Sequence, residues 1–527
     1  MITGKNYIGN ALKGSGSKTF KTFNPQLNKE TSWQFIEATE EELKEAVTLA
    51  WDAFKEFQKT TGTQKATFLR AIADEIEALD NELIETYCAE SGLPEGRAKG
   101  ERGRTCFQLR MFADLVEDGS WVDASIDIAN KDRQPNPKPD LRKMLIPIGP
   151  IAVFGASNFP LAYSTAGGDT ASALAAGCPV VVKSHPMHAG TGELVASAIL
   201  KAAKNTKMPN GVFSNLNSSG IEVGKLLVNH PLIKGVGFTG SIGGGRALFN
   251  MAAEREEPIP VFAEMGSINP VIVLPKALKQ KGKEWAKKYA SSITLGTGQF
   301  CTNPGLILGI AGEELEDFIS TLGEEIEKVE PMCMLNPGIL SRYEENKKKM
   351  LAENDVSIVT DYSSNVPQNY AKQAVITADG ESFLKNPQLH QEVFGPFSLV
   401  VKFQNKEQLT EAIANLEGQL TGTFISEDNE VEDYGDVVHA LQNRVGRVIF
   451  NGVPTGVEVC TAMQHGGPYP ASTDSRFGAV GVQGIQRWVR PLSFQDWPNH
   501  LLPDALKNDN PLQILRTVNG DKTKDAI

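Results

Sequence analysis

Short runs of β-branched and aliphatic residues alternate with helix-length segments through most of the chain, and this alternation is the strongest constraint on its fold. Five such runs lie between residues 151 and 266, with helical patterns at about 190–204, 221–229 and 244–255. A second series extends from about 267 to 470. Strands that alternate with helices predict parallel sheets covered by helices on both faces. The sequence therefore predicts an α/β chain with two such domains.

The region before the first of these strands is predicted to be helical over residues 39–117. Thr39 is followed by three acidic residues, which is typical of a helix N-cap and first turn. The helical spacing of apolar residues continues through 68–92 and ends at Gly92 and Pro94, and a third helix is expected at about 98–117.

Two further segments do not follow the alternation. Residues 130–144 are rich in proline and charge, which indicates a linker or an extended surface arm. The C-terminal stretch 477–498 has exposed-looking aromatic residues and little material for a core of its own, so we expect it to pack against another domain or subunit. The expected units are a cofactor domain (1–125 and 145–265), a catalytic domain (266–465) and an oligomerisation arm with the C-terminal segment (126–144 and 466–527).

Length, charge and cysteine usage narrow the class of protein. A chain of 527 residues is too long for one core. Its net charge of −12 argues against a nucleic-acid partner. The six cysteines form no CxxC pair, which fits a reducing compartment and gives no metal-binding pattern. Because we find neither a secretory signal nor an apolar run long enough to span a membrane, we expect a cytoplasmic protein with no membrane partner.

The stretch "GTGQFCTNPG" (296–305) presents one cysteine in an unusual setting. A structural cysteine usually has apolar neighbours. Cys301 instead stands among glycines, small polar residues and a proline, which indicates a thiol presented by a turn.

A glycine-rich turn, "GFTGSIGGGR" (237–246), follows one of the predicted strands and opens a helix. Glycines at such a turn let the backbone approach a pyrophosphate, and the helix N-terminus supplies N–H donors. An ordinary turn is equally compatible with this pattern. Lys183 ends another strand, where it suits a ribose hydroxyl or a phosphate, and no acid follows it before Glu193. This pattern favours NADP as the cofactor, with NAD possible.

Six motifs occur in one order over about 240 residues: "GASNFP", "VVVKSHP", "GFTGS", "AEMGSINP", "GQFCTNPG" and "QEVFGP". Together they resemble the aldehyde dehydrogenase superfamily, and the likeness covers nearly the whole chain. The stretches "STAGGDTASALAAGCPVVVKSHPMH" and "STDSRFGAVGVQGIQRWVRP" are similar to an NADP-linked branch that oxidises 2,5-dioxopentanoate, alongside some long-chain aldehyde dehydrogenases. The resemblance implies a Rossmann-type cofactor domain, an α/β catalytic domain and a small β oligomerisation element. It also implies a homodimer or homotetramer.

The resemblance assigns the chemistry to three residues. It implies that Cys301 is the nucleophile that forms a thiohemiacetal and then a thioester. Asn158 matches a side-chain donor to the tetrahedral oxygen. Glu264, at the end of a strand, matches the base that hydrolyses the thioester, and partial burial there would raise its pKa towards the working range.

The remaining site residues are expected around the cofactor and the substrate. Those assigned to the cofactor are Lys183 at the adenosine ribose, Ser184 and His185 near a 2′-phosphate, Gly240 and Ser241 at the pyrophosphate, Gly266, and Glu392 with Phe394 at the nicotinamide end. Those assigned to the substrate are Arg104, Gln108, Phe159 and Tyr163. Arg104 and Gln108 are four apart and so share a helix face, and a guanidinium there suits a carboxylated aldehyde.

Other functions remain possible from the residues alone. An acylating dehydrogenase that passes its thioester to coenzyme A does not need Glu264. A long-chain aldehyde oxidiser would need an apolar tunnel rather than Arg104. A cysteine hydrolase needs neither "GFTGS" nor Glu392, and a noncatalytic binding protein needs none of the three residues assigned to the chemistry.

Overall fold

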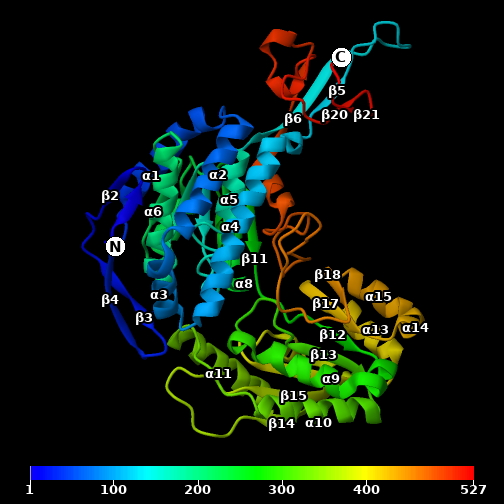
Figure 1. Cartoon of the computed structure of the whole chain (residues 1–527). Coiled ribbons are helices and arrows are strands. Elements are labelled where there is room, and N and C mark those ends of the chain that lie inside the picture. The colour runs from blue at the N-terminus through cyan, green and yellow to red at the C-terminus, as the bar shows by residue number, and fades with distance from the viewer. Residues whose placement is uncertain (1) are drawn as a thin grey trace.

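The computed structural model describes residues 2–527 and consists of two large sheet-containing units and a projecting arm (Figure 1). The first unit contains a seven-stranded sheet in the order β11-β10-β7-β8-β9-β1-β2. Its strands are β1 (Asn6–Ile8), β2 (Ala11–Lys13), β7 (Ile151–Phe154), β8 (Val180–Lys183), β9 (Phe213–Leu216), β10 (Gly235–Thr239) and β11 (Val261–Glu264).

The predicted parallel sheet is confirmed for β7 to β11, which pair with one another in parallel. The N-terminal hairpin adds β1 and β2 in antiparallel pairing at the edge, which the sequence did not predict. Helices cover both faces of the sheet. Along β7, Ile151 and Val153 join the core beneath α2, α4 and α6, whereas Ala152 and Phe154 join the core beneath α1 and α7.

The helices of the first unit are α1 (Glu40–Phe57), α2 (Gly62–Glu77), α3 (Asp80–Ser91), α4 (Glu95–Asp118), α5 (Gly168–Ala176), α6 (Ala189–Asn205), α7 (Glu222–Asn229) and α8 (Ile242–Ala253). The predicted N-cap is confirmed, because the Thr39 hydroxyl accepts from the Glu42 N–H. The helical pattern predicted over 68–92 is broken between α2 and α3, so reading it as continuous was wrong. No glycine or proline marks that break.

The second unit has the sheet order β14-β15-β16-β13-β12-β17-β18, in which only β14 is antiparallel to its neighbour. Its strands are β12 (Val271–Val273), β13 (Leu306–Ile310), β14 (Val356–Asp361), β15 (Ala374–Asp379), β16 (Phe397–Phe403), β17 (Gln419–Ile425) and β18 (Val445–Phe450). Its helices are α9 (Pro275–Thr294), α10 (Glu313–Glu327), α11 (Pro337–Leu351), α12 (Gly380–Lys385), α13 (Lys406–Ala414), α14 (Asp428–Val431) and α15 (Gly435–Gln442).

The arm projects from the end of the first unit that lies away from the second (Figure 1). The sheet of the arm has the order β19-β6-β5-β20-β21. A separate hairpin, β3 with β4, lies outside the arm, beside α3 of the first unit. These strands are β3 (Thr19–Asn24), β4 (Lys29–Ile36), β5 (Ser125–Asp127), β6 (Leu141–Pro147), β19 (Val489–Gln495), β20 (Arg516–Val518) and β21 (Asp521–Thr523). No helix within residues 2–527 is both long enough and apolar enough to span a bilayer.

The aromatic residues expected to be exposed in the stretch 477–498 differ: Trp497 is 49% exposed, as expected, whereas Trp488 is not. Trp488 is fully buried in the core of the first unit, where its indole N–H donates to the Ser172 hydroxyl at 2.7 Å. The arm also has a small core of its own, which includes Ile126, Leu506 and Ile514. The sequence did not reveal this core because its members come from both ends of the chain.

Candidate active site

Cys301 lies on a turn directly after the short 3₁₀ segment η3 (Leu295–Gly298), as the sequence predicted. Backbone φ is positive, between 53° and 65°, at the last three residues of that segment, so the chain turns sharply before the thiol. Gly298 is required there, because a Cβ would lie 2.2 Å from the carbonyl oxygen of Gly395. The Asn269 amide donates to the Cys301 carbonyl at 2.8 Å, which fixes the turn from the other side.

Two cavities meet at Cys301. The α4 cavity, of about 360 Å³, is lined by Gly96, Arg97, Gly100, Glu101, Arg104, Phe159, Tyr163, Leu295, Phe300, Cys301, Thr302 and residues 455–457. The α8 cavity, of about 260 Å³, is lined by Ser157, Asn158, residues 239–241, residues 264–266, Cys301, Ile339, Arg342, Tyr343, Asn346, Glu392, Phe394, Leu420 and His465. The thiol can therefore be approached from two sides by two different molecules.

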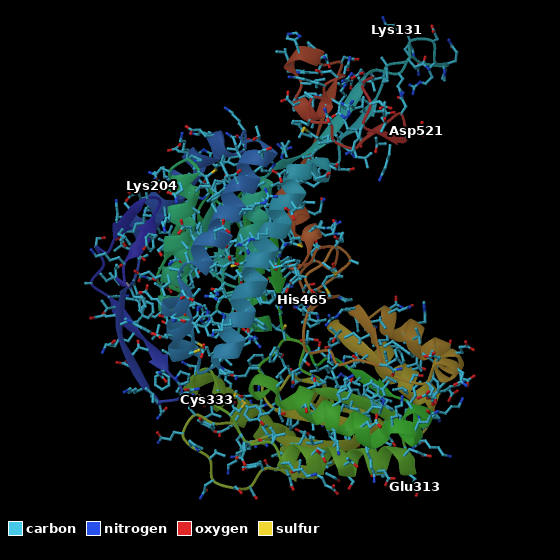
Figure 2. All side chains as sticks on the ribbon, viewed as in Figure 1. Lys131, Lys204, Glu313, Cys333, His465 and Asp521 are labelled. Atoms are coloured by element: carbon cyan, nitrogen blue, oxygen red, sulfur yellow. The ribbon has the colours of Figure 1, made fainter. Side chains whose placement is uncertain are left out.

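A histidine connects the thiol to the predicted base. His465 lies where the two large units meet (Figure 2). Its Nε2 is 3.7 Å from the Cys301 Sγ and 3.5 Å from the Glu264 Oε2. The same ring nitrogen is thus within 4 Å of both the thiol and the carboxylate. His465 was not among the predicted site residues.

Glu264 is 5% exposed, at the end of β11. Its Oε1 accepts from the Ala479 N–H at 2.7 Å, whereas its Oε2 has no hydrogen-bond partner and lies next to His465. Burial raises the pKa of Glu264 to about 8, although the Arg487 guanidinium opposes the shift. A carboxyl group with this pKa can hold a proton or accept one near neutral pH.

Burial also sets the protonation of the other two groups. It raises the pKa of the Cys301 thiol to about 12, and the carboxylates of Glu264 and Glu392 add to the shift. It lowers the pKa of His465 to about 3, so the imidazole is neutral at physiological pH. The site thus holds a neutral thiol beside a neutral imidazole.

Donors for a negatively charged oxygen lie beside the thiol. Asn158 follows β7, and its amide donates one hydrogen to the Gln299 carbonyl at 2.9 Å, which orients the side chain towards Cys301. The amide carries a second hydrogen. The backbone N–H of Cys301 points towards its own sulfur closely enough to lower the pKa of the thiol. Both donors are therefore near the point where an oxyanion would form.

Glu392 and Phe394 line the α8 cavity on the side of the second unit. Burial raises the pKa of Glu392 to about 7, and the Ser267 N–H approaches its Oε1 at 3.4 Å. Gly266 makes room for this carboxylate, since a Cβ there would lie 2.2 Å from its Oε2. The predicted Gly266 and Glu392 thus meet in one place.

The glycine-rich turn forms the opposite wall of the α8 cavity. Gly240 and Ser241 line it, and the Ser241 hydroxyl caps α8 by accepting from the Gly244 N–H at 3.2 Å. No atom lies within 4 Å of a Cβ built on Gly243, so the first turn of α8 exposes bare backbone. Such an opening suits a phosphate group.

Lys183, Ser184 and His185 lie apart from both cavities. Lys183 ends β8 at the same sheet edge, and burial lowers its pKa to about 8 while the Glu37 carboxylate opposes that shift. Glu37 is fixed there because its Oε1 accepts from the Ser219 N–H at 3.0 Å. Ser184 is 1% exposed, and the imidazole of His185 accepts from the Met187 N–H. The structure thus brings an acid close to Lys183 from a distant segment.

The predicted substrate residues separate into two groups. The Arg104 guanidinium donates to the Tyr163 hydroxyl at 2.9 Å, and the Tyr163 ring packs edge-on against Phe159 with centroids 5.1 Å apart. All three side chains line the α4 cavity. Gln108 does not line it, because its amide is buried and donates to the Ala479 carbonyl at 3.3 Å.

His465 and Arg97 are among the cavity-lining residues that sequence reasoning missed. His465 stands in the loop "QHGGPYP", and no residue near it in the sequence suggests that it contacts Cys301. Arg97 carried a usable signal, since it precedes Arg104 by seven residues and therefore shares its helix face.

Comparison with known proteins identifies relatives along nearly the full length. The sequence model of the aldehyde dehydrogenase family matches residues 12–489. The chain is 44% identical over 525 residues to an alpha-ketoglutaric semialdehyde dehydrogenase of Acinetobacter baylyi, which covers 99% of both chains. It is also 44% identical over 520 residues to alpha-ketoglutaric semialdehyde dehydrogenase 2 of Azospirillum brasilense, covering 98% of this chain and 99% of the relative.

Among solved structures, a betaine aldehyde dehydrogenase of Staphylococcus aureus in complex with NAD+ is similar, with a TM-score of 0.82 and 20% identity. The match covers 94% of this chain and 96% of that one. At this identity the likeness shows the fold, and it confirms the predicted Rossmann-type and α/β architecture.

Proposed function

The chain belongs to the aldehyde dehydrogenase family, and we propose that it oxidises 2,5-dioxopentanoate to 2-oxoglutarate. An enzyme of this family is an oxidoreductase that acts on the aldehyde group. The two relatives of 44% identity support the choice of a carboxylated substrate. The observation that carries the proposal is the position of the Arg104 guanidinium in the cavity that leads to Cys301. A guanidinium binds a carboxylate with charge-assisted hydrogen bonds.

Cys301 begins the reaction as the nucleophile. Its Sγ adds to the aldehyde carbon, and the carbonyl oxygen becomes the alkoxide of a thiohemiacetal. The thiol proton moves to His465, 3.7 Å away, and from there to Glu264. Asn158 and the Cys301 N–H donate to the alkoxide. A nicotinamide dinucleotide bound in the α8 cavity would supply hydride acceptance, and Cys301 would then hold the acyl group as a thioester.

Glu264 then acts as the base for hydrolysis. Once Glu264 has released the thiol proton to solvent, its carboxylate takes a proton from water while the water oxygen attacks the thioester carbon, and the Cys301 sulfur departs with the electron pair of the broken C–S bond. With a pKa of about 8, the group can give up the proton and accept another at each turnover. An enzyme that passed the acyl group to coenzyme A would have no use for this base.

The residues of the α8 cavity fit a nicotinamide dinucleotide. The bare first turn of α8, capped by Ser241, would hold the pyrophosphate. Glu392 would hold the nicotinamide ribose and Lys183 the adenosine ribose. We propose NADP as the preferred cofactor and NAD as an alternative. The nearby Glu37 carboxylate would weaken binding of a 2′-phosphate, so this preference is expected to be modest.

We also propose that the chain works as a homodimer or homotetramer, with the arm as the contact. Large apolar side chains of the arm are exposed, including Trp497 (49%), Leu501 (57%) and Leu512 (49%). Light scattering on the purified chain tests this. A monomeric mass at micromolar concentration would contradict it.

The first experiment measures initial rates of reduced-cofactor formation with 2,5-dioxopentanoate, succinic semialdehyde and a long-chain aldehyde, each with NADP and with NAD. We expect the highest kcat/KM for 2,5-dioxopentanoate. A higher value for the long-chain aldehyde would overturn the proposed substrate while leaving the roles of Cys301 and Glu264 intact. No cofactor reduction with any of the three would contradict the proposed oxidation and favour a noncatalytic protein or a cysteine hydrolase.

A further inference from the structure

One face of α4 forms a wall of the α4 cavity. Residues 96, 97, 100, 101 and 104 all line it, which is the spacing of a single helix face. Gly96 and Gly100 on this face have no atom within 4 Å of a built Cβ, so the helix leaves open space there. The charged members of the wall are Arg97, Glu101 and Arg104.

The only carboxylate among the residues that line the α4 cavity is already committed to the protein. Glu101 is 4% exposed, and its Oε1 accepts from the N–H groups of Leu161 and Ala162 at 2.8 and 2.9 Å. Its Oε2 accepts from the Tyr87 hydroxyl at 2.6 Å and, at 3.5 Å, from the Arg97 Nε, with which it forms an ion pair. One carboxylate, shared with three neutral donors, faces two guanidinium groups, so the cavity wall keeps a net positive charge.

Arg97 is held on the aromatic rings that flank the thiol. Its guanidinium carbon lies 4.4 Å from the ring centroid of Phe159 and 4.7 Å from that of Phe300. Phe159 directly follows Asn158, and Phe300 directly precedes Cys301. An arginine stacked on aromatic faces is less hydrated and less mobile than a free one, so it loses less entropy when it binds an anion.

Arg104 has unused hydrogen-bonding capacity in the same cavity. Its described side-chain partner is the Tyr163 hydroxyl, a neutral group whose pKa burial raises further. Its Nε is buried without a hydrogen-bond partner. Arg97 and Arg104 are separated by seven residues, which is roughly 10 Å along a helix axis. The wall therefore offers guanidinium groups at two depths.

We propose that Arg97 is a second residue that determines substrate specificity, and that together with Arg104 it selects anionic over neutral aldehydes. This inference rests on the proposed function, because it assigns the carboxylate of that substrate to a site. The shape of the wall supports it, since Gly96 and Gly100 keep the space beside Arg97 free of side chains.

The test compares kcat/KM for 2,5-dioxopentanoate with kcat/KM for pentanal, a neutral aldehyde with the same number of carbons. The variants are Arg97→Gln, Arg97→Lys and Arg104→Gln. Arg102→Gln is the matched control, because Arg102 lies on the same helix and is instead directed towards Asp80. A thermal shift of the apo protein with 2-oxoglutarate gives a readout of carboxylate binding that does not depend on turnover.

Arg97→Gln removes one guanidinium. It should lower the ratio of kcat/KM for 2,5-dioxopentanoate to kcat/KM for pentanal by roughly 10- to 100-fold, mainly through a higher KM for 2,5-dioxopentanoate. The ratio for Arg97→Lys should lie between those of Arg97→Gln and the wild type, and the ratio for Arg102→Gln should match the wild type. Arg97→Gln should also weaken the thermal shift by 2-oxoglutarate. If Arg97→Gln kept the wild-type ratio, the inference would be overturned while the proposed substrate survived. If the wild-type enzyme itself preferred pentanal, the proposed function would fail, and the role of Arg97 with it.

Discussion

Replacing Glu264 with glutamine should stabilise the folded chain, and the gain in stability should increase with pH. Burial raises the pKa of this carboxyl from 4.5 to about 8. Between these two values the unfolded chain has released the proton and the folded chain still holds it, so folding takes up a proton. The contribution of Glu264 to stability is therefore complete below pH 4.5 and is lost as pH rises towards 8. Glutamine cannot ionise and has no such loss.

The expected gain in stability follows from the pKa values of Glu264 in the unfolded and folded chain. Each pH unit between them changes stability by about 1.4 kcal/mol for a single group. Relative to its value below pH 4.5, the free energy of unfolding of the wild-type chain is lower by roughly 3 kcal/mol at pH 7 and by less than about 1 kcal/mol at pH 5. Glutamine keeps the acceptor for the Ala479 N–H, a hydrogen bond of 2.7 Å in the wild type, and has nearly the same volume. The difference between variant and wild type should thus isolate the ionisation.

Thermal melting of both proteins at pH 5, 6, 7 and 8 measures this difference, since other titrating groups cancel in the comparison. For cooperative unfolding of the 527-residue chain, a gain of 3 kcal/mol corresponds to an increase in Tm of about 3 °C. Glu392→Gln is a useful companion, with a smaller expected gain because the pKa of Glu392 is raised only to about 7. A Tm gain of equal size at pH 5 and pH 8 would refute the argument. In the same variant, loss of the group that accepts first the thiol proton and later the water proton should slow both the formation and the hydrolysis of the thioester.

Three other predictions follow from the site. Asn158→Ala should lower kcat roughly 10²–10³-fold with little change in Tm, as steady-state kinetics and melting can check. His465→Gln should slow thiol ionisation, so the rate of Cys301 alkylation by iodoacetamide should fall at every pH between 6 and 9; an unchanged rate would exclude the proton path. Gly100→Ala should stabilise α4 by up to about 1 kcal/mol, whereas Gly100→Leu should narrow the α4 cavity and lower kcat/KM for every aldehyde.

The sequence predicted those parts of the fold that depend on local pattern. Strands with continuous aliphatic runs, such as 180–183, were recognised, because a strand buried on both faces has that composition. Strand β17, "QLTGTFI", is equally buried but was not predicted, since its threonines and glycine break the apolar run. The break at Leu79, between α2 and α3, also has no local signal, and tertiary packing determines it.

The limits of the site prediction have the same physical origin. The side chains of Cys301 and Glu264 each stand in a motif that can be recognised alone. His465 becomes significant only through its distances to both of them, which no spacing in the chain encodes. Glu37 is a similar case: the sequence after Lys183 contains no nearby acid, yet the fold brings one from about 146 residues earlier in the chain.

The return of the chain to the first unit after residue 465 explains how the base is held. Residues 466–488 follow the second unit in sequence but pack on the first. There Ser472 forms an isolated antiparallel β-bridge with the backbone of Glu264, and the Ala479 N–H donates to the Glu264 carboxylate. Residues 466–488 therefore complete the site, although the predicted domain boundary at residue 465 places them with the arm. This segment therefore directs one oxygen of Glu264 towards the Ala479 N–H and leaves the other facing His465, so the geometry of the base depends on the return of the chain.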